Sequence, residues 1–163
     1  MSWSNFTEKG VRDEFGNDIR SYDPEFNFIE DNTLIEGEFQ SEQYFGHRLD
    51  EIDGWLSTNK SYCDNSDICL IGFRGGEFAL YPDLFLTMDY WEEAIRMMKE
   101  INPKMEFEVE TDDPKLARDF FPDFKIVHDI EENWCKMRGF KYAIITNSSF
   151  YILPRLLKHN HKT

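Results

Sequence analysis

The sequence predicts an α/β fold with a mostly parallel sheet flanked by helices. From residue 68 onward, apolar runs of strand length alternate with amphipathic helical patterns. Each helical pattern separates one strand from the next, as in βαβ units, whose parallel strands need a crossover helix. A chain of 163 residues with 40% hydrophobic content is also large enough to bury the core that such a domain requires.

The beginning of the chain differs from the rest. Residues 1–32 are polar, acidic and aperiodic, which predicts an extended arm or the remnant of a missing amino-terminal half. The folded domain is expected over residues 33–163. It would begin with a short strand in "TLIEGEF" and continue with a helix capped by Ser41, in which positions 45, 49, 52 and 56 share an apolar face.

Four strands and four helices are then expected in alternation. The strands are predicted at 68–73, 105–110, 125–128 and 142–146, and together with the helices they make the arrangement Rossmann-like. The strict alternation of "MEFEVE" at 105–110 predicts that one face of that strand is solvated. The expected helix signals are caps at Asp89, Asp113, Asp129 and Ser148, stops at Pro103 and Gly139, and a late start or a kink at Pro154.

Polar side chains follow each strand of this sheet. Because ligands of open parallel sheets bind outside the carboxyl ends of the strands, these segments are expected to form one site. Arg74, beside glycine backbone and facing hydroxyl groups and a helix start, suits a phosphate or pyrophosphate. The aspartates could accept hydrogen bonds from a base or a ribose. The four segments are Arg74-Gly75-Gly76-Glu77, Thr111-Asp112-Asp113, His128-Asp129 and Thr146-Asn147-Ser148-Ser149.

Each element of this nucleotide site also has a structural explanation. Arg74 could be a loop arginine with a solvated head, and Asp113 and Ser148 could simply cap helices. His128 could be a hydrogen-bonded residue at a strand end. Only the convergence of several polar strand ends favours a functional site over a plain structural α/β domain.

Charge and composition restrict the partners. The net charge of -14 disfavours nucleic acid, and no apolar run is long enough for a transmembrane segment. We expect a cytoplasmic protein, either free in solution or peripheral to the membrane. The odd number of cysteines and the absence of a Cys-x-x-Cys pair disfavour disulfides and a thiolate zinc site, so Cys63, Cys69 and Cys135 are expected to be reduced and mostly buried.

Four blocks resemble the GDP-fucose-dependent alpha-1,2-fucosyltransferases and their bacterial and viral relatives. "GEFQSEQYF" is similar to the family's Gly-Tyr-Phe-Gln-Ser-Glu-Lys-Tyr-Phe block, and "IGFRGGEF" to its Ile-His-Ile-Arg-Arg-Gly-Asp-Tyr motif. "ETDDP" resembles its Ser-Asp-Asp strand end, and "ITNSSF" its Asn-Ser-Ser-Phe-Ser block. The blocks occur in the family order and cover the chain from about Thr33 to Leu157.

The resemblance implies the donor-binding half of a GT-B glycosyltransferase, a hexosyltransferase that works without a metal or other cofactor. Arg74 would contact the donor pyrophosphate, Ser148 and Ser149 would line the same pocket, and Asp112 and Asp113 would lie near the nucleoside. Arg74 and Glu77 would be the catalytic residues. The implied donor-binding residues are Arg74, Gly75, Gly76, Asp112, Asp113, Asn147, Ser148, Ser149 and Phe150.

The chain also departs from the family pattern. Gly72 stands where the family has histidine, Gly75 where it has a second arginine, and Glu77 where it has aspartate. The glycine-rich segment of the family's amino-terminal half is absent. The implied partners are a nucleotide sugar, a glycan acceptor and either a missing amino-terminal half or a homo-oligomer. The expected function is therefore fucosyl transfer from GDP-fucose to a glycan hydroxyl, and the alternative is a truncated, non-catalytic nucleotide-sugar-binding or assembly module.

Overall fold

The computed structural model describes residues 4–9, 11–12, 18–19, 21–58, 60 and 67–160. Contacts within the chain divide it into two compact units, Met1–Ile52 and Asp53–Thr163. The division therefore falls at 52/53, whereas the sequence suggested a change at 32/33. We describe each unit by itself.

The first unit is built from short elements. β1 (Ser4–Thr7) pairs in parallel with β4 (Thr33–Glu36), which confirms the strand predicted in "TLIEGEF". Its other described elements are the antiparallel pair β2 (Val11–Arg12) and β3 (Asp18–Ile19) and the 3-10 helices η1 (Pro24–Phe28), η2 (Glu42–Tyr44) and η3 (Gly46–Arg48). Helix α1 (Leu49–Trp55) follows, and the division at 52/53 falls within it. The predicted cap is confirmed, because Ser41 accepts a hydrogen bond from the Gln43 N–H at 3.4 Å, although a 3-10 turn follows it.

Aromatic rings hold this unit together. Phe26 packs 4.9 Å from Tyr44 and 5.7 Å from Phe39, between ring centroids, and Phe6 lies 6.0 Å from Phe26. Tyr44 is 7% exposed and its hydroxyl oxygen accepts a hydrogen bond from the Asp23 N–H at 2.6 Å. The stretch expected to form an arm thus contributes Phe6 and Phe26 to a cluster with residues beyond position 32.

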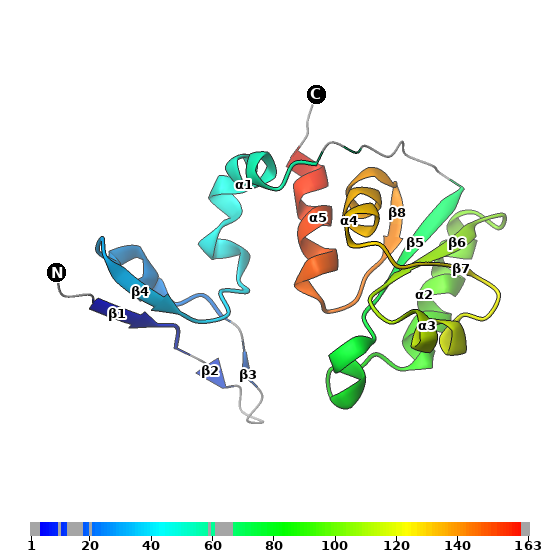
Figure 1. Cartoon of the computed structure of the whole chain (residues 1–163), viewed down its shortest axis with the longest axis horizontal. Helices are drawn as coiled ribbons and strands as arrows, with labels where there is room; N and C mark the ends of the chain where they lie inside the picture. Colours follow the sequence, from blue (N-terminus) through cyan, green and yellow to red (C-terminus); the bar gives the residue numbers. More distant parts are fainter. Residues whose placement is uncertain are drawn as a thin grey trace. The chain divides into compact units, whose positions relative to one another are not determined.

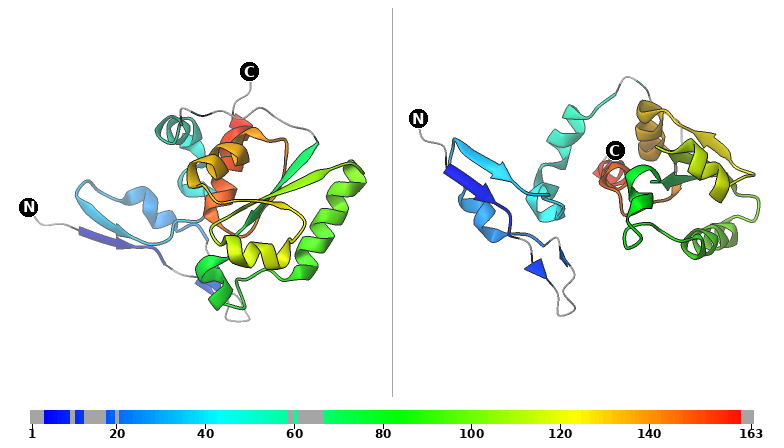
Figure 2. Two further views of the ribbon diagram at one scale, coloured as in Figure 1. Left: turned by 45° about the vertical axis from the view of Figure 1, so that its right-hand side comes forward. Right: turned by 60° about the horizontal axis from the view of Figure 1, so that its bottom comes forward.

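The second unit contains a four-stranded parallel sheet. Its strands lie in the order β7-β6-β5-β8, where β5 is Ile68–Phe73, β6 is Glu106–Thr111, β7 is Lys125–Val127 and β8 is Tyr142–Ile144. All three pairings are parallel. This arrangement confirms the predicted α/β fold with a parallel, Rossmann-like sheet (Figures 1 and 2).

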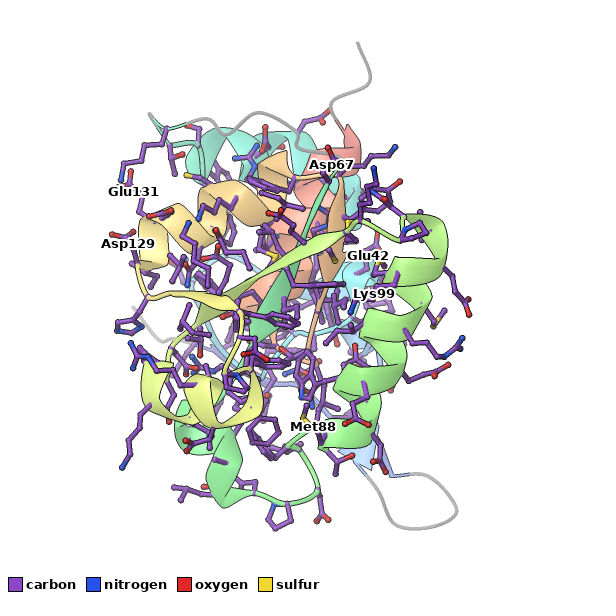
Figure 3. The ribbon with its side chains drawn as sticks, turned by 90° about the vertical axis from the view of Figure 1, so that its right-hand side faces the viewer. Glu42, Asp67, Met88, Lys99, Asp129 and Glu131 are labelled. Atoms are coloured by element: carbon purple, nitrogen blue, oxygen red, sulfur yellow. The ribbon has the colours of Figure 1, made fainter. Side chains whose placement is uncertain are left out.

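Helices cover both faces of the sheet. α2 (Met88–Ile101) and α3 (Pro114–Phe120) lie on one face, and α4 (Ile130–Gly139) and α5 (Ser149–Asn160) lie on the other (Figure 1). Figure 3 marks Met88 at the start of α2, and Asp129 and Glu131 at the start of α4. The chain crosses from β5 toward β7 by α2 and α3 and returns to the other side of β5 by α4, so the strand order reverses between β5 and β8.

Most predicted helix signals are confirmed. Asp113 accepts a hydrogen bond from the Leu116 N–H at 3.0 Å, and Asp129 accepts one from the Glu132 N–H at 2.8 Å. The prediction for Asp89 is wrong, because α2 begins one residue before it, after Thr87. Of the two outcomes expected at Pro154, the late start is wrong, since α5 already begins at Ser149 and contains Pro154, and the kink stays a prediction.

The prediction of a solvated face on β6 is wrong. Glu108 is 7% exposed and Glu110 is 0% exposed, although both occupy the polar positions of the alternating pattern. Helix α4 covers these positions and places the ammonium group of Lys136 against the Glu108 carboxylate. A covering helix that supplies a cation therefore allows an alternating strand to be buried on both sides.

Cysteine burial follows the sequence expectation where the structure describes it. Cys69 and Cys135 are buried and form no disulfide, and Cys63 lies outside the described residues. Burial raises the pKa of the Cys69 thiol to about 12, so it stays protonated at neutral pH. Within the described part of the chain, no helix is both long and apolar enough to cross a bilayer.

Candidate functional site

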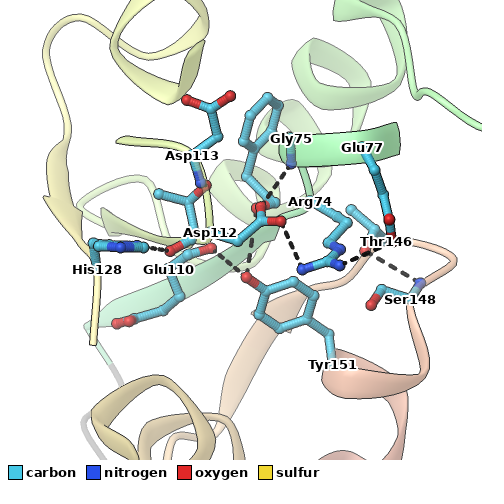
Figure 4. Close-up of polar contacts among 12 residues, drawn as sticks. Arg74, Gly75, Glu77, Glu110, Asp112, Asp113, His128, Thr146, Ser148 and Tyr151 are labelled. Atoms are coloured by element: carbon cyan, nitrogen blue, oxygen red, sulfur yellow. Dashed lines mark hydrogen bonds and ion pairs between the residues drawn. The ribbon is translucent and has the colours of Figure 1, made fainter. Parts of the chain in front are cut away.

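The carboxyl ends of β5 and β6 are joined by an arginine and an aspartate. Arg74 directly follows β5, and its Nη1 lies 2.6 Å from Oδ2 of Asp112, which follows β6 (Figure 4). The other oxygen, Oδ1, accepts a hydrogen bond from the Gly75 N–H at 2.9 Å. Register explains the meeting, because Phe73 pairs with Thr111 and the next residue on each strand is Arg74 and Asp112.

The two glycines after Arg74 make room for the acidic pair. A Cβ at Gly76 would lie 2.6 Å from Asp112 Oδ2, and its φ of +38° also disfavours residues with a side chain. A Cβ at Gly75 would lie 2.7 Å from the Cβ of Asp113. The close approach of Arg-Gly-Gly to Asp-Asp therefore depends on the absence of side chains at 75 and 76.

Tyr151 closes the site from α5. Its hydroxyl donates to the carbonyl oxygens of Glu110, at 2.8 Å, and Phe73, at 3.4 Å, where β6 and β5 end. A Cβ at Gly72 would lie 2.7 Å from this tyrosine ring, so the ring occupies the space that a side chain at position 72 would need. Burial raises the pKa of Tyr151, which keeps the hydroxyl protonated and able to donate.

A cavity of about 120 Å³ lies beside these residues. Of the predicted site residues, it is lined by Arg74, Asp112 and Phe150. Sites that enclose a drug-sized ligand span roughly 300–1,000 Å³, so this cavity has room for one small ring or phosphate group. The rest of a nucleotide sugar would lie outside it.

The other predicted residues have different surroundings. Asp113 caps α3, and its N–H donates to Thr111 Oγ1 at 2.9 Å. The Asn147 amide donates to Leu84 O at 3.1 Å, and Ser148 is buried, with its N–H 3.3 Å from Thr146 Oγ1. Ser149 begins α5, and the Glu77 side chain is 69% exposed.

Sequence reasoning missed part of the cavity wall. Tyr151, Asn133 and Ile130 line the cavity from the first turns of α5 and α4, and nothing in those helical patterns marks them as site residues. The only sequence signal was Gly72, whose missing side chain makes room for the Tyr151 ring. His128, left open by the sequence, also lines the cavity. Its Nδ1 lies 2.9 Å from Thr111 O and must donate, because a carbonyl oxygen only accepts.

A buried carboxyl group lies directly behind the cavity. This group belongs to Glu110 and contacts Asn133 in the cavity wall. When the Asn133 amide is oriented to satisfy both of its partners, its nitrogen donates to Glu110 Oε2 and to Asp129 O. Burial raises the pKa of Glu110 to about 8, and the effect outweighs the opposing charge of Lys136, whose Nζ is 3.3 Å from Oε1. At neutral pH Glu110 is therefore mostly protonated.

Charge around the strand ends is mostly negative. Glu77 and Asp112 contact the guanidinium of Arg74, with Glu77 Oε1 3.4 Å from Arg74 Nη2, and the Asp113 carboxylate caps α3 nearby (Figure 4). Across the residues that the structure describes, no group of three or more histidine, cysteine, aspartate or glutamate side chains is arranged to hold a metal ion. Independence from metal stays a prediction.

Comparison of the chain with protein-family models, with curated proteins and with solved structures gave no match. The resemblance to fucosyltransferases therefore rests on the sequence blocks alone.

Proposed function

We propose that residues 53–163 bind the diphosphate of a nucleotide sugar at the carboxyl edge of the sheet, as the donor domain of a glycosyltransferase. One observation carries the proposal: Arg74 is held at the end of β5, next to the point where the strand order reverses. Crevices at such reversal points are the usual ligand sites of open α/β sheets.

The guanidinium has donors to spare. Arg74 Nη2 has only the 3.4 Å contact with the exposed Glu77, and the buried Nε makes no hydrogen bond with the residues that the structure describes. Phosphate oxygens form charge-assisted hydrogen bonds with such groups. The start of α5 faces the same edge and would add its dipole to the attraction for an anion.

The proposed reaction is fucosyl transfer, with GDP-fucose as the first candidate donor on the strength of the sequence resemblance. The acceptor hydroxyl would attack the anomeric carbon, a new glycosidic C–O bond would form, and the bond to the diphosphate would break. Arg74 and the start of α5 would stabilise the departing diphosphate. Glu77, whose carboxylate is exposed beside Arg74, would accept the proton of the acceptor hydroxyl.

A nucleotide-sugar-binding module without turnover is the second candidate. The cavity of about 120 Å³ and the two carboxylates that already contact Arg74 favour it, because both limit how much of a donor the domain can bind. Release of free sugar or transfer to an acceptor separates the two candidates. Product formation supports the transferase, and donor binding without any product supports the module.

Calorimetry with GDP, GDP-fucose, GDP-mannose and UDP-sugars tests the proposal. Arg74→Ala is expected to weaken GDP binding about ten- to hundred-fold, because a charge-assisted contact contributes roughly 1.5–3 kcal/mol. Arg74→Lys should restore only part of the affinity, since an ammonium group lacks the fixed planar geometry by which the guanidinium pairs with Asp112 through Nη1 and presents Nη2 to phosphate.

The matched control is Arg96→Ala. Arg96 is an exposed arginine on α2 that pairs with Glu93 and Glu100, so its loss should leave binding unchanged. If no nucleotide or nucleotide sugar binds the wild-type chain, the proposed function is wrong. If GDP binds and Arg74→Ala binds it equally well, the phosphate role of Arg74 is wrong.

A further inference from the structure

Asp112 commits both of its oxygens to one short loop. Oδ2 pairs with Arg74 Nη1 at 2.6 Å, and Oδ1 accepts from the Gly75 N–H at 2.9 Å. The carboxylate therefore fixes the guanidinium and the backbone that follows it at the same time. The Phe78 ring, 5.5 Å from Arg74 Cζ, supports the guanidinium from a further side.

The opposite edge of the guanidinium is uncommitted. Asp112 reaches Nη1, whereas Nη2 has only the long contact with Glu77, and the buried Nε has no hydrogen-bond partner among the described residues. A carboxylate that competed with the ligand would be expected to take the two-pronged edge formed by Nε and Nη2. Asp112 instead takes the nitrogen on the other side, which leaves Nη2 for a phosphate oxygen.

The glycine pair fixes the length of the acidic side chain. Because a Cβ at Gly76 would lie 2.6 Å from Asp112 Oδ2, the carboxylate rests directly against the backbone of the loop. A longer acid would not fit this space in the same position. Aspartate and the two glycines thus form one unit whose geometry places Arg74.

We propose that Asp112 is a positioning residue of the phosphate site, which acts through Arg74 rather than by contact with the nucleoside. The inference rests on the proposed function. It differs from the role implied by the sequence resemblance, where the acidic pair lies near the nucleoside. The physical basis of the positioning role is that both Asp112 carboxylate oxygens already have protein partners.

The test compares binding of inorganic pyrophosphate, GDP and guanosine by calorimetry with the full chain. Asp112→Ala is expected to lower GDP and pyrophosphate affinity about tenfold, or roughly 1.4 kcal/mol. Asp112→Asn, which keeps the shape and the acceptor for Gly75, should fall between wild type and Asp112→Ala. Guanosine, which has no phosphate, should bind all of these variants equally well.

A double-mutant cycle separates positioning from an independent contact. In the Arg74→Ala background, Asp112→Ala should cause no further loss of GDP affinity, because the group through which it acts is gone. Asp119→Asn, the same charge change at an exposed position on α3, is the matched control and should leave binding unchanged.

Three results would overturn the positioning role. Unchanged GDP affinity in both Asp112 variants would mean that the ion pair is purely structural. Increased GDP affinity would mean that Asp112 competes with the ligand. Weaker guanosine binding would mean that Asp112 contacts the nucleoside. If Asp112→Ala does not fold, Asp112→Asn decides between the same results. If the wild-type chain binds neither GDP nor pyrophosphate, the proposed function and the positioning role are both overturned. If only Arg74→Ala loses GDP affinity, the positioning role of Asp112 is overturned and the proposed function stands.

Discussion

The two faces of the parallel sheet are buried in different ways. Under α2 and α3 the contacts are apolar, and the rings of Phe73, Trp91 and Phe121 lie 5.6 Å from one another. Under α4 and α5, apolar residues share the interface with Glu108 and Glu110. The difference shows that strand polarity alone does not decide burial in this domain, because a covering helix can supply the partner of a buried carboxyl group.

Charges in the cluster around Lys136 on the second face balance when one carboxyl group is neutral. Lys136, with a side chain 5% exposed, pairs with Glu108 and, at 2.6 Å, with Glu132. Lys125 pairs with Glu108 at 2.5 Å from the edge of the sheet. With Glu110 protonated, two carboxylates face two ammonium groups, and the Glu110 proton can be shared with Glu108.

The largest effect is expected from Lys136→Met, which removes the buried cation and keeps an apolar stem of similar length. Glu108 and Glu132 would lose their shared partner, and breaking a buried pair on one side costs about 3–5 kcal/mol. Urea unfolding at pH 7 measures this loss, and it should shrink toward pH 5 as the carboxylates become able to protonate.

Lys125→Met is the matched control on the same carboxylate. The Lys125 side chain is 66% exposed, so its loss should cost under about 1 kcal/mol. Equal losses for the two lysine variants would show that the second face is not a buried charge cluster, and the contrast between the faces would fail.

The pH dependence of stability is the second expected effect. Because the folded pKa of Glu110, about 8, is above its ordinary value of 4.5, the folded chain binds more protons than the unfolded chain between these values. Its stabilising contribution is fully present below about pH 4.5 and is lost as pH rises through 8. One such proton lowers the unfolding free energy by at most about 1.4 kcal/mol per pH unit.

Glu110→Gln isolates this contribution. The amide resembles the protonated carboxyl group in size, so the variant should fold at pH 7 and show a flatter stability profile between pH 5 and 8 than the wild-type chain. Unfolding series in urea at several pH values give the two profiles. Parallel profiles would mean that Glu110 does not titrate in this range.

A smaller effect is expected on the apolar face from Ile71→Val. Ile71 is 0% exposed, and removal of one buried methylene typically costs about 0.5–1.5 kcal/mol. The loss should be the same at pH 5 and pH 8, because this cluster contains no carboxyl, imidazole or amino group and its Cys69 thiol stays protonated in that range. A pH-dependent loss would show that the two faces are coupled through the sheet.

Much of the site could be predicted from strand ends. Arg74 and Asp112 each follow an apolar run directly, and the parallel topology brings them together as expected. The carboxylate that Arg74 contacts was not predictable, because the pairing depends on the register between β5 and β6, which are far apart in the sequence. Tyr151 and Asn133 were missed because they reach the cavity from helices. Helical periodicity indicates which residues are buried, but it does not indicate which side chains line a cavity.

Local patterns were enough for the elements themselves. Apolar runs, Asp113 and Asp129 as caps, and strand–helix alternation determined a parallel α/β sheet, because they act within a few residues of one another. Tertiary structure alone decided the burial of Glu108 and Glu110. The alternating sequence pattern of a strand is the same whether water or a helix that carries Lys136 covers its polar face. Tertiary structure also decided the protonation state of Glu110 and its ion-pair partners, because the desolvation of this carboxyl group depends on the final packing of α4.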